Sequence, residues 1–550
     1  MSAEYKEKTR KSASRTPAKT SNFWAWVVLT VILLTVTLIR VRMLSIPLER
    51  DEGEFAYMGQ LMLDHIPPYK IAYNMKLPGV YASYAVIMAV FGQTIVAIHL
   101  GLLLINLVAI VLLFLLVKRL VDPLAAVVAA GAYGLNSASM SVLGTSAHAT
   151  HFIMPYALGG MLLMLKGLES KRPYLFFVSG LLLGLGFIMK QHAIIFIAFA
   201  ALYVIWANLA ARPIAWKSLV RQEVLLMAGS VIPFAVTCLI LYKAGVFAKF
   251  WFWVFHYARE YESQTTGRMI WANFSQQIGR ITGPFVWLWG LAGVGLIIVF
   301  LDRRLKEKRA FLGGFALFSA LTVCPGFYFR PHYYVPFLAA IGLLAGVAVS
   351  SSQLWMSRCR YTTHLRSIPL VLAAMTLFLG AAGNRPFWFA PSPTFAARLE
   401  YGGNPFPEMI EVAKYLKAHT NENDVIGILG SEPETFFYAH RRSATGMIYT
   451  YGLMEHQKYA RQMLKDTIRE LETSRPKYMV FVIIPPSWLA RPDSDTTIFT
   501  WAKQYLQTYY HMVGMVEFVS EDNVIYLWDE DVEGYLPTSS NFIMVLKRKD

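Results

Sequence analysis

The chain has 550 residues, of which 55% are hydrophobic and only 16% are charged, and its formal net charge is +16. A water-soluble globular protein carries about 25% charged residues, so the composition excludes a soluble enzyme over most of the length, and an aromatic share of 14% excludes a disordered chain. The excess of basic residues is assigned to the flanks of membrane helices rather than to nucleic-acid binding, and no nucleic-acid partner is expected.

The chain begins with a polar, basic stretch over residues 1–22, which continues into the apolar run 23–42 without a cleavage pattern. This arrangement predicts an uncleaved cytoplasmic tail followed by a first spanning helix.

Twelve apolar segments follow one another along residues 23–383. They are 23–42, 79–92, 95–117, 123–142, 152–168, 174–189, 192–209, 224–242, 282–301, 310–325, 332–350 and 367–383. About 20 residues are needed to cross the hydrocarbon layer, and segment 79–92 is too short to do so comfortably. The sequence therefore predicts a polytopic α-helical membrane domain over 23–383.

The basic clusters decide how these segments are oriented. If 79–92 lies on the membrane surface, all the clusters near 118, 171, 217, 306 and 360 fall on one side, as the positive-inside rule requires. We therefore expect about eleven spanning helices and a long outer loop over 43–94. This is an integral membrane protein, expected in a bacterial inner membrane, with its N-terminus in the cytoplasm.

The composition changes after residue 383. Six prolines and glycines between 391 and 407 predict a linker over 384–407. Residues 408–550 alternate helical and strand patterns, which predicts a soluble α/β domain on the extracytoplasmic side.

The first candidate site opens the long outer loop. Asp51, Glu52 and Glu54 lie directly after the first spanning helix, and Lys76 follows at the depth of the lipid headgroups. The carboxylates fit either an ordinary helix N-terminus or a catalytic group, and Lys76 is suited to a lipid phosphate.

A second cluster opens the late apolar helix. Arg330, His332, Tyr333 and Tyr334 lie within five residues. An aromatic belt with an exposed arginine would produce such a pattern, but the guanidinium also offers a rigid donor fork for phosphate oxygens.

Two further outer turns carry titratable residues. His148 and His151 are spaced to ligate a metal or to shuttle protons, or are simply solvated at the interface. Lys190 adds a cation on the same side, and the aromatic run 250–261 offers a wall for an isoprenoid chain or a sugar ring.

In this order, these motifs resemble the membrane GT-C glycosyltransferases. The closer resemblance is to the bacterial protein-mannosyltransferase-like branch of glycosyltransferase family 39, which includes the aminoarabinose transferases of lipid A. It covers most of residues 20–350 and rests on the Asp51-Glu52 pair, the Lys76-Leu77-Pro78 motif, the long loop and the late Arg/His/Tyr-Tyr cluster.

The resemblance implies transfer of a sugar from a polyprenyl-phosphate carrier to a glycan, lipid or protein acceptor on the extracytoplasmic face. It implies that Asp51 is catalytic with Glu52 beside it, that Lys76 contacts the carrier phosphate, and that Arg330 to Tyr334 contact phosphate and lipid. Relatives differ in their need for a divalent ion, so the cofactor stays unknown.

The sequence leaves one rival function open, a transporter or flippase of a lipid-linked substrate. Transporters place ionisable residues near mid-membrane in interrupted helices. Here the charged motifs lie at the outer ends of the helices, which favours the enzyme.

Overall fold

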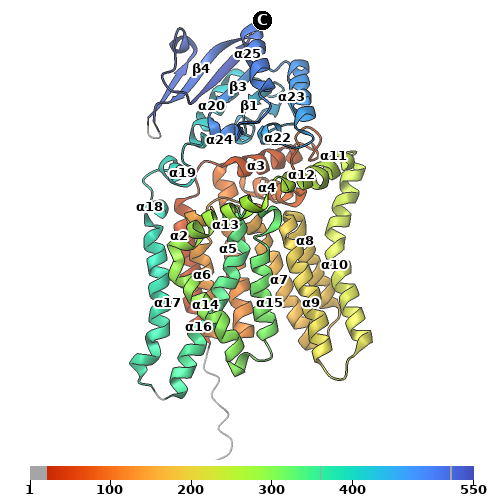
Figure 1. Ribbon diagram of the computed structural model, residues 1–550, viewed down its shortest axis with the longest axis vertical. Helices are drawn as coiled ribbons and strands as arrows, with labels where there is room; N and C mark the ends of the chain where they lie inside the picture. The colour runs from red at the N-terminus through yellow and green to blue at the C-terminus, as the bar shows by residue number, and fades with distance from the viewer. Residues whose placement is uncertain (1–21, 360, 521–522, 550) are drawn as a thin grey trace, which may run out of the picture.

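The computed structural model describes residues 22–359, 361–520 and 523–549, so the basic tail predicted over 1–22 lies, except for Asn22, outside the described residues. A bundle of long helices forms one half of the molecule, and a domain with a β-sheet sits on one end of it (Figure 1).

Eight of the described helical segments are long and apolar enough to cross a membrane. They are α2 (Phe23–Arg42), α5 (Ile95–Leu120), α7 (Ala149–Ser170), α9 with the turn before it (Gln191–Ala210), α10 (Trp216–Lys243), α13 with α14 (Gly267–Leu301), α16 with the turn before it (Pro331–Arg358) and α17 (Thr363–Gly383). Four shorter apolar helices accompany them: α4 (Pro78–Phe91), α6 (Pro123–Asn136), α8 (Tyr174–Met189) and α15 (Arg309–Leu321). The polytopic helical fold is confirmed, and the predicted spans coincide with these eight segments together with α6, α8 and α15.

The helices differ in how far they are enclosed by the bundle. In the most apolar stretch of α16, 89% of the residues are buried, whereas in that of α17 only 11% are buried. The α16 helix therefore forms the centre of the bundle, whereas the apolar side chains of α17 face outward, where lipid would cover them.

A layer of shorter helices separates the bundle from the sheet domain. It contains α3 (Arg50–Leu63), α4, α11 (Phe247–Trp251), a π-helix (Phe252–Tyr257) and α12 (Ala258–Ser263). The α4 helix, predicted to be interfacial, lies in this layer (Figure 1). The long loop 43–94 is thus folded into two helices.

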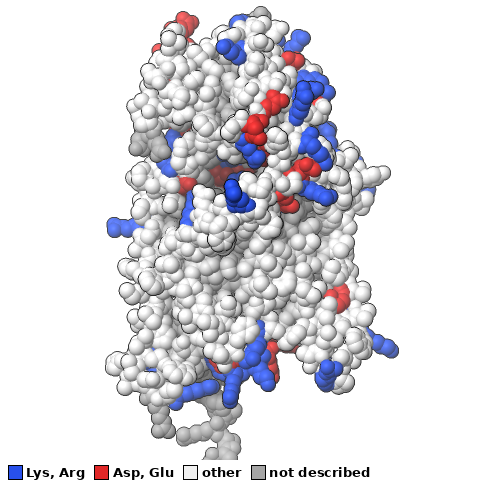
Figure 2. All heavy atoms as spheres, in the orientation of Figure 1, with Lys and Arg blue, Asp and Glu red and all other residues white. Residues whose placement is uncertain are grey.

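The opposite end of the bundle is basic. Arg119 forms an ion pair with Glu169, and the Lys308 ammonium donates to the Arg119 carbonyl oxygen at 3.4 Å. Arg304 lies 3.9 Å from Asp122. Loops far apart in the sequence therefore share this end, where Lys and Arg gather below a broad band with few charged side chains (Figure 2).

The C-terminal domain contains a mixed six-stranded sheet in the order β2-β1-β3-β6-β4-β5. Its strands are β1 (Val425–Leu429), β2 (Arg442–Ser443), β3 (Tyr478–Ile483), β4 (Tyr510–Phe518), β5 (Val524–Trp528) and β6 (Phe542–Arg548). The first three strands are parallel, and the others pair antiparallel. Strand β3 is almost fully buried, as expected for an uninterrupted apolar strand at the centre of a sheet.

Helices precede and separate the first four strands of this domain. They include α20 (Phe406–His419), α21 (Glu434–Ala439), α22 (Tyr451–Met454), α23 (Ala460–Ser474), α24 (Pro485–Trp488) and α25 (Thr497–Tyr509). Strands β4 and β5 form an antiparallel hairpin near the C-terminus. The sequence did not predict β6, which lies between β3 and β4 and makes half of the sheet antiparallel.

The segment predicted as a linker is folded onto the bundle. It contains α18 (Arg385–Trp388) and α19 (Pro393–Tyr401). Phe387 and Trp388 pack in a small core with Ile39 and Met43 of α2, and the Trp388 indole donates to the Ala138 carbonyl oxygen at 2.8 Å. The prolines and glycines of this segment therefore mark short helix ends rather than an extended tether.

Helix α3 is held by the C-terminal domain. The Leu48 amide donates to the Tyr438 hydroxyl at 2.9 Å, and the Ser443 amide donates to the Tyr57 hydroxyl at 2.8 Å. At Gly53, a Cβ atom would come within 2.5 Å of the Glu434 backbone nitrogen. Only glycine allows α3 and the domain to approach this closely.

Candidate functional site

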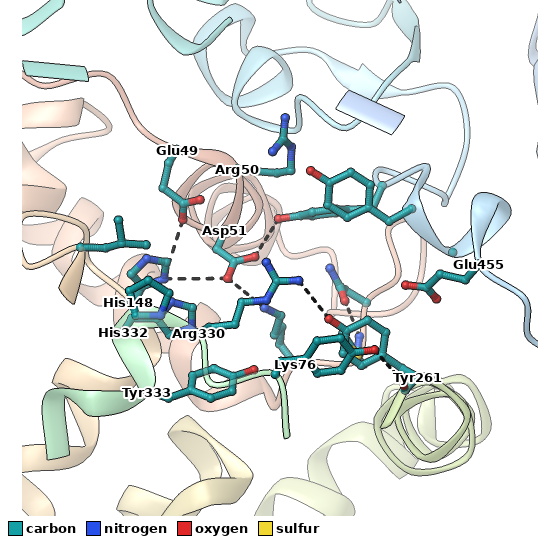
Figure 3. A pocket seen from close by; sticks show the side chains of 18 of the residues that line it. Glu49, Arg50, Asp51, Lys76, His148, Tyr261, Arg330, His332, Tyr333 and Glu455 are labelled. Carbon is teal, nitrogen blue, oxygen red and sulfur yellow. Dashed lines mark hydrogen bonds and ion pairs between the residues drawn. The ribbon is translucent and has the colours of Figure 1, made fainter. Parts of the chain in front are cut away.

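A cavity of about 580 Å³ lies where the bundle, the interfacial layer and the C-terminal domain meet. Its lining residues come from all three parts of the molecule and include Glu49, Arg50, Asp51, Lys76, His148, Trp253, Tyr257, Tyr261, Tyr328, Arg330, His332, Tyr333, Glu400, Tyr449, Tyr451 and Glu455. Figure 3 views this cavity from close by.

The start of α3 fixes the position of the first carboxylates. The Glu49 side chain accepts from the Glu52 amide, and the Glu52 side chain accepts from the Glu49 amide, which forms a capping box. This arrangement directs Asp51 into the cavity, where 22% of its side chain is exposed.

Three groups surround the Asp51 carboxylate. The Lys76 ammonium lies 3.1 Å from Oδ2, the Tyr449 hydroxyl donates to Oδ1 at 2.9 Å, and Nδ1 of His148 lies 3.8 Å from Oδ2. Burial by itself would raise the pKa of Asp51, but Lys76, His148 and Lys190 outweigh it and hold the pKa well below its ordinary value. Asp51 is therefore ionised at neutral pH.

Three cations gather near this carboxylate. Lys76 is paired with Asp51, while Arg330 donates to the Tyr261 hydroxyl at 3.2 Å. The Lys190 ammonium lies over the Tyr333 ring, 4.1 Å from its centroid, and among the described residues it has no anionic partner. Burial, with Lys76 close by, lowers the pKa of Lys190.

His148 and His332 form a stacked pair beside Asp51, with ring centroids 3.9 Å apart and an interplanar angle of 16° (Figure 3). Both ring nitrogens of His148 and Nδ1 of His332 are buried without a hydrogen-bond partner among the described residues. Burial lowers the pKa of His148 to about 4, which keeps its imidazole neutral at pH 7.

The same three residues could hold a metal ion. One ligand atom from each of Asp51, His148 and His332 lies within 4.8 Å of the others. A carboxylate with two neutral imidazoles suits zinc and other transition metals. The sequence had joined His148 with His151 instead.

Two predicted carboxylates do not line the cavity. Glu52 is buried, accepts from the Ala147 amide at 2.6 Å and pairs with His99 at 3.1 Å, so its contacts are those of a structural residue. Glu54 accepts from Asn74 at 2.6 Å and from Tyr81 at 2.5 Å. Burial raises the pKa of Glu54 to about 8.

The remaining predicted residues divide into two groups. Tyr333 and His332 line the cavity, whereas His151 and Tyr334 are buried and do not. His151 contacts Asn106, with Nδ1 3.2 Å from the amide oxygen. Lys190 is absent from the lining and reaches the site through its contact with Tyr333.

Several lining residues were not selected as site residues from the sequence. Neither Glu49 nor Arg50 was among the candidate residues, and Glu400 lies in the segment 384–407 that was predicted as a linker. Tyr449 and Glu455 belong to the soluble domain, whose role was unknown. The only local signal was the tyrosine pair in Tyr449-Thr450-Tyr451, since two aromatic residues are unusual in a loop.

Comparisons with known proteins point to one fold. Residues 76–240 match the profile of the family described as dolichyl-phosphate-mannose-protein mannosyltransferase. No curated protein sequence shows significant similarity to the chain.

Three solved structures are similar over almost the whole chain. The structure of ArnT from Cupriavidus metallidurans bound to undecaprenyl phosphate is 15% identical with a TM-score of 0.60, and the match covers 96% of this chain and 98% of that one. Its apo state is 16% identical with a TM-score of 0.56 over the same shares. The oligosaccharyltransferase of Archaeoglobus fulgidus, in complex with Zn and sulfate, is 14% identical with a TM-score of 0.55, covering 92% of this chain and 73% of that one.

These matches confirm the fold. The chain shares the overall fold of these solved structures, as the resemblance to the GT-C glycosyltransferases implied.

Proposed function

We propose that this protein transfers a sugar from a polyprenyl-phosphate-linked donor to an acceptor hydroxyl on the extracytoplasmic face of the membrane. The observation that carries the proposal is the gathering of Lys76, Lys190 and Arg330 around the Asp51 carboxylate. Three cations beside one carboxylate leave an excess of positive charge, and a bound phosphate would neutralise it.

The position of the site favours a lipid-linked phosphate. The cavity lies at the end of the bundle, next to the interfacial helices, where a headgroup would stand while its chain lay along the apolar helices. The similar ArnT structure is described as bound to undecaprenyl phosphate, which supports a carrier of this class here.

Asp51 is suited to orient the acceptor. Its carboxylate is ionised and held on both oxygens, by Lys76 and by Tyr449. In the proposed reaction the acceptor oxygen attacks the anomeric carbon and its proton passes to Asp51. The bond between that carbon and the phosphate oxygen breaks, and its electron pair stays on the phosphate.

The cations stabilise the departing phosphate. Lys76 and Arg330 lie in the cavity, and both carry donors that match phosphate oxygens. Tyr333, which lies over Lys190, adds a hydroxyl at the same place.

A divalent ion fits the chemistry of Asp51, His148 and His332, which would hold it. When bound, such an ion would add positive charge beside the phosphate. The two imidazole rings lie in nearly parallel planes, 3.9 Å apart between centroids, and each would offer one ring nitrogen to such an ion.

The charge distribution supports the proposed orientation. The cytoplasmic side would be the end where Arg119, Lys308 and Arg304 meet, because basic loops stay inside. The cavity lies at the other end of the bundle, which would then face the extracytoplasmic side.

A turnover assay on the purified full chain tests the proposal. We expect the protein, reconstituted in lipid, to consume a polyprenyl-phosphate-linked sugar when a glycan, lipid or protein acceptor is added, and to release the bare carrier phosphate. If no donor in a panel of sugars is consumed but labelled carrier lipid crosses the bilayer, a flippase replaces the transferase.

A further inference from the structure

One end of the cavity is built from aromatic rings that the phosphate site does not use. Trp253 and Tyr257 come from the π-helix, with ring centroids 5.0 Å apart, and both line the cavity. Tyr261 of α12 stacks on Tyr328, with centroids 4.6 Å apart and planes 20° apart. π-Helices are rare and occur frequently at functional sites, so this placement of rings is unusual for a plain interfacial helix.

The C-terminal domain adds a carboxyl group to these rings. Glu455 lines the cavity, and its Oε2 accepts from the Tyr257 hydroxyl at 3.1 Å. Burial raises the pKa of Glu455 to about 7. At Gly452 a Cβ atom would come within 2.6 Å of that same hydroxyl, so the domain approaches the π-helix as closely as backbone allows.

Two contacts outside the cavity hold this end together. Lys458 of the domain pairs with Glu260 of α12 at 2.7 Å, and Tyr459 packs edge-on against Phe252 of the π-helix, with centroids 4.9 Å apart. The aromatic rings and Glu455 are therefore brought together by the docked domain.

This end lies next to the phosphate site and away from the histidines. In Figure 3, Tyr261 and Glu455 lie on one side of Lys76 and Arg330, and His148 and His332 lie on the other. Arg330 connects the two parts, because its guanidinium donates to the Tyr261 hydroxyl at 3.2 Å. A group attached to a phosphate at Lys76 and Arg330 can thus reach the aromatic rings.

We propose that Trp253, Tyr257, Tyr261, Tyr328 and Glu455 form the subsite for the donor sugar, with Glu455 accepting hydrogen bonds from ring hydroxyls. This proposal rests on the proposed function. A sugar offers both C–H faces that pack on aromatic rings and hydroxyl donors that need acceptors. An isoprenoid chain offers no donor, and a half-buried carboxyl group such as that of Glu455 would lose hydrogen bonds beside it without compensation.

The experiment distinguishes binding of the sugar from binding of its lipid carrier. The affinity of the full chain in nanodiscs is measured for undecaprenyl phosphate alone and for the same lipid carrying mannose, glucose, galactose or arabinose. We expect the wild-type protein to bind at least one glycosylated lipid about 10-fold more tightly than the bare lipid, because a site built for hydroxyl groups discriminates against a ligand that lacks them.

Glu455→Ala should abolish this difference and leave the affinity for the bare lipid unchanged. Tyr257→Phe, which keeps the ring and removes the hydroxyl that holds Glu455, should reduce the difference in part. Glu411→Ala is the matched control, since Glu411 pairs with Lys414 on the domain surface and does not line the cavity.

Equal loss of affinity for the bare and glycosylated lipids in Glu455→Ala would assign this end to the carrier and overturn the sugar subsite. The sugar subsite is also overturned if Glu455→Ala still prefers the glycosylated lipid, or if the wild-type protein prefers none of the glycosylated lipids. If the wild-type protein binds neither the bare nor the glycosylated lipid, the proposed function itself fails. The affinity for the bare lipid distinguishes this result from failure of the sugar subsite alone.

Discussion

The two walls of the cavity differ in charge. The bundle and its outer loops supply Lys76 and Arg330 together with the His148 and His332 pair, whereas the C-terminal domain supplies mainly uncharged side chains such as Tyr449. The cations lie where the proposed function would hold a lipid phosphate, and the domain covers this part of the cavity with hydrogen-bond donors and acceptors. The domain is therefore part of the site rather than an appendage to it.

Helix α3 lies between these two walls and connects them. Arg50 pairs with Glu432 of the domain at 3.1 Å, while the next residue, Asp51, pairs with Lys76 at 3.1 Å. Two adjacent residues thus join α3 to the opposite walls of the cavity, Arg50 to the C-terminal domain and Asp51 to Lys76 of the outer loop. Any movement of the domain relative to the bundle would move the carboxylate, and the following predictions test this coupling from the largest expected effect to the smallest.

The largest effect is expected at Asp51, the carboxylate that both walls hold. Asp51→Asn keeps the shape but cannot take a proton, and turnover should fall by about 10²–10⁴-fold. The measurement is the turnover rate of purified protein, with a thermal melting curve to establish folding. Asp64→Asn, at the exposed far end of the same helix, should keep full activity. Turnover near that of the wild type in Asp51→Asn would exclude it as the catalytic carboxylate.

The second effect concerns the bundle wall alone. Lys76→Ala removes a charged contact with the donor phosphate, and donor affinity should fall by about 10–100-fold. Equilibrium binding of undecaprenyl phosphate measures this. Lys414→Ala is the control, because Lys414 is exposed on the C-terminal domain, pairs with Glu411 and does not line the cavity. Equal affinities of both variants would show that Lys76 does not bind the phosphate.

The third effect concerns the domain wall alone. Tyr449→Phe removes the hydroxyl that donates to Asp51 at 2.9 Å. Turnover should fall by about 10-fold, as expected for one hydrogen bond to a charged acceptor. The KM for the donor should stay constant, because the phosphate contacts are untouched.

Tyr510→Phe is the matched control for that variant. It also removes a tyrosine hydroxyl, which donates to the Pro476 carbonyl oxygen at 2.8 Å and accepts from Arg548 at 3.4 Å, but Tyr510 does not line the cavity. If Tyr510→Phe slows turnover as much as Tyr449→Phe, the effect is one of domain stability rather than of the position of Asp51.

The smallest effect concerns the contact between the walls. Gly53→Ala places a methyl group within 2.5 Å of the Glu434 backbone nitrogen, and the protein should lose about 1–3 kcal/mol of stability as α3 and the domain are forced apart. Thermal unfolding in detergent measures this loss. Gly267→Ala, where a Cβ atom would meet open space, should not lower the melting temperature. A Gly53→Ala protein with the melting temperature of the wild type would indicate that the interface can accommodate a methyl group.

The sequence predicted much of the bundle and part of the site. Apolar runs and basic clusters are local properties, so spans such as 23–42 and 174–189 match their helices exactly. Asp51 and Lys76 were identified by their places in the chain, and the structure brings them to 3.1 Å of each other. Nothing in the order of residues placed Lys190 against Tyr333, because that contact joins two separate turns.

What the sequence by itself determined is the membrane bundle, because burial of apolar side chains in lipid depends only on the composition of each segment. Only the tertiary structure decided which polar residues share the cavity. Glu52 and Glu54 lie within three residues of Asp51, yet the rotation of α3 directs them into the protein interior. Tyr449 and Glu455 are about 400 residues away from Asp51 in the chain, and they reach the site because the domain docks on α3 through Tyr438 and Ser443. Side-chain direction and domain docking depend on long-range packing, which no local pattern of residues encodes.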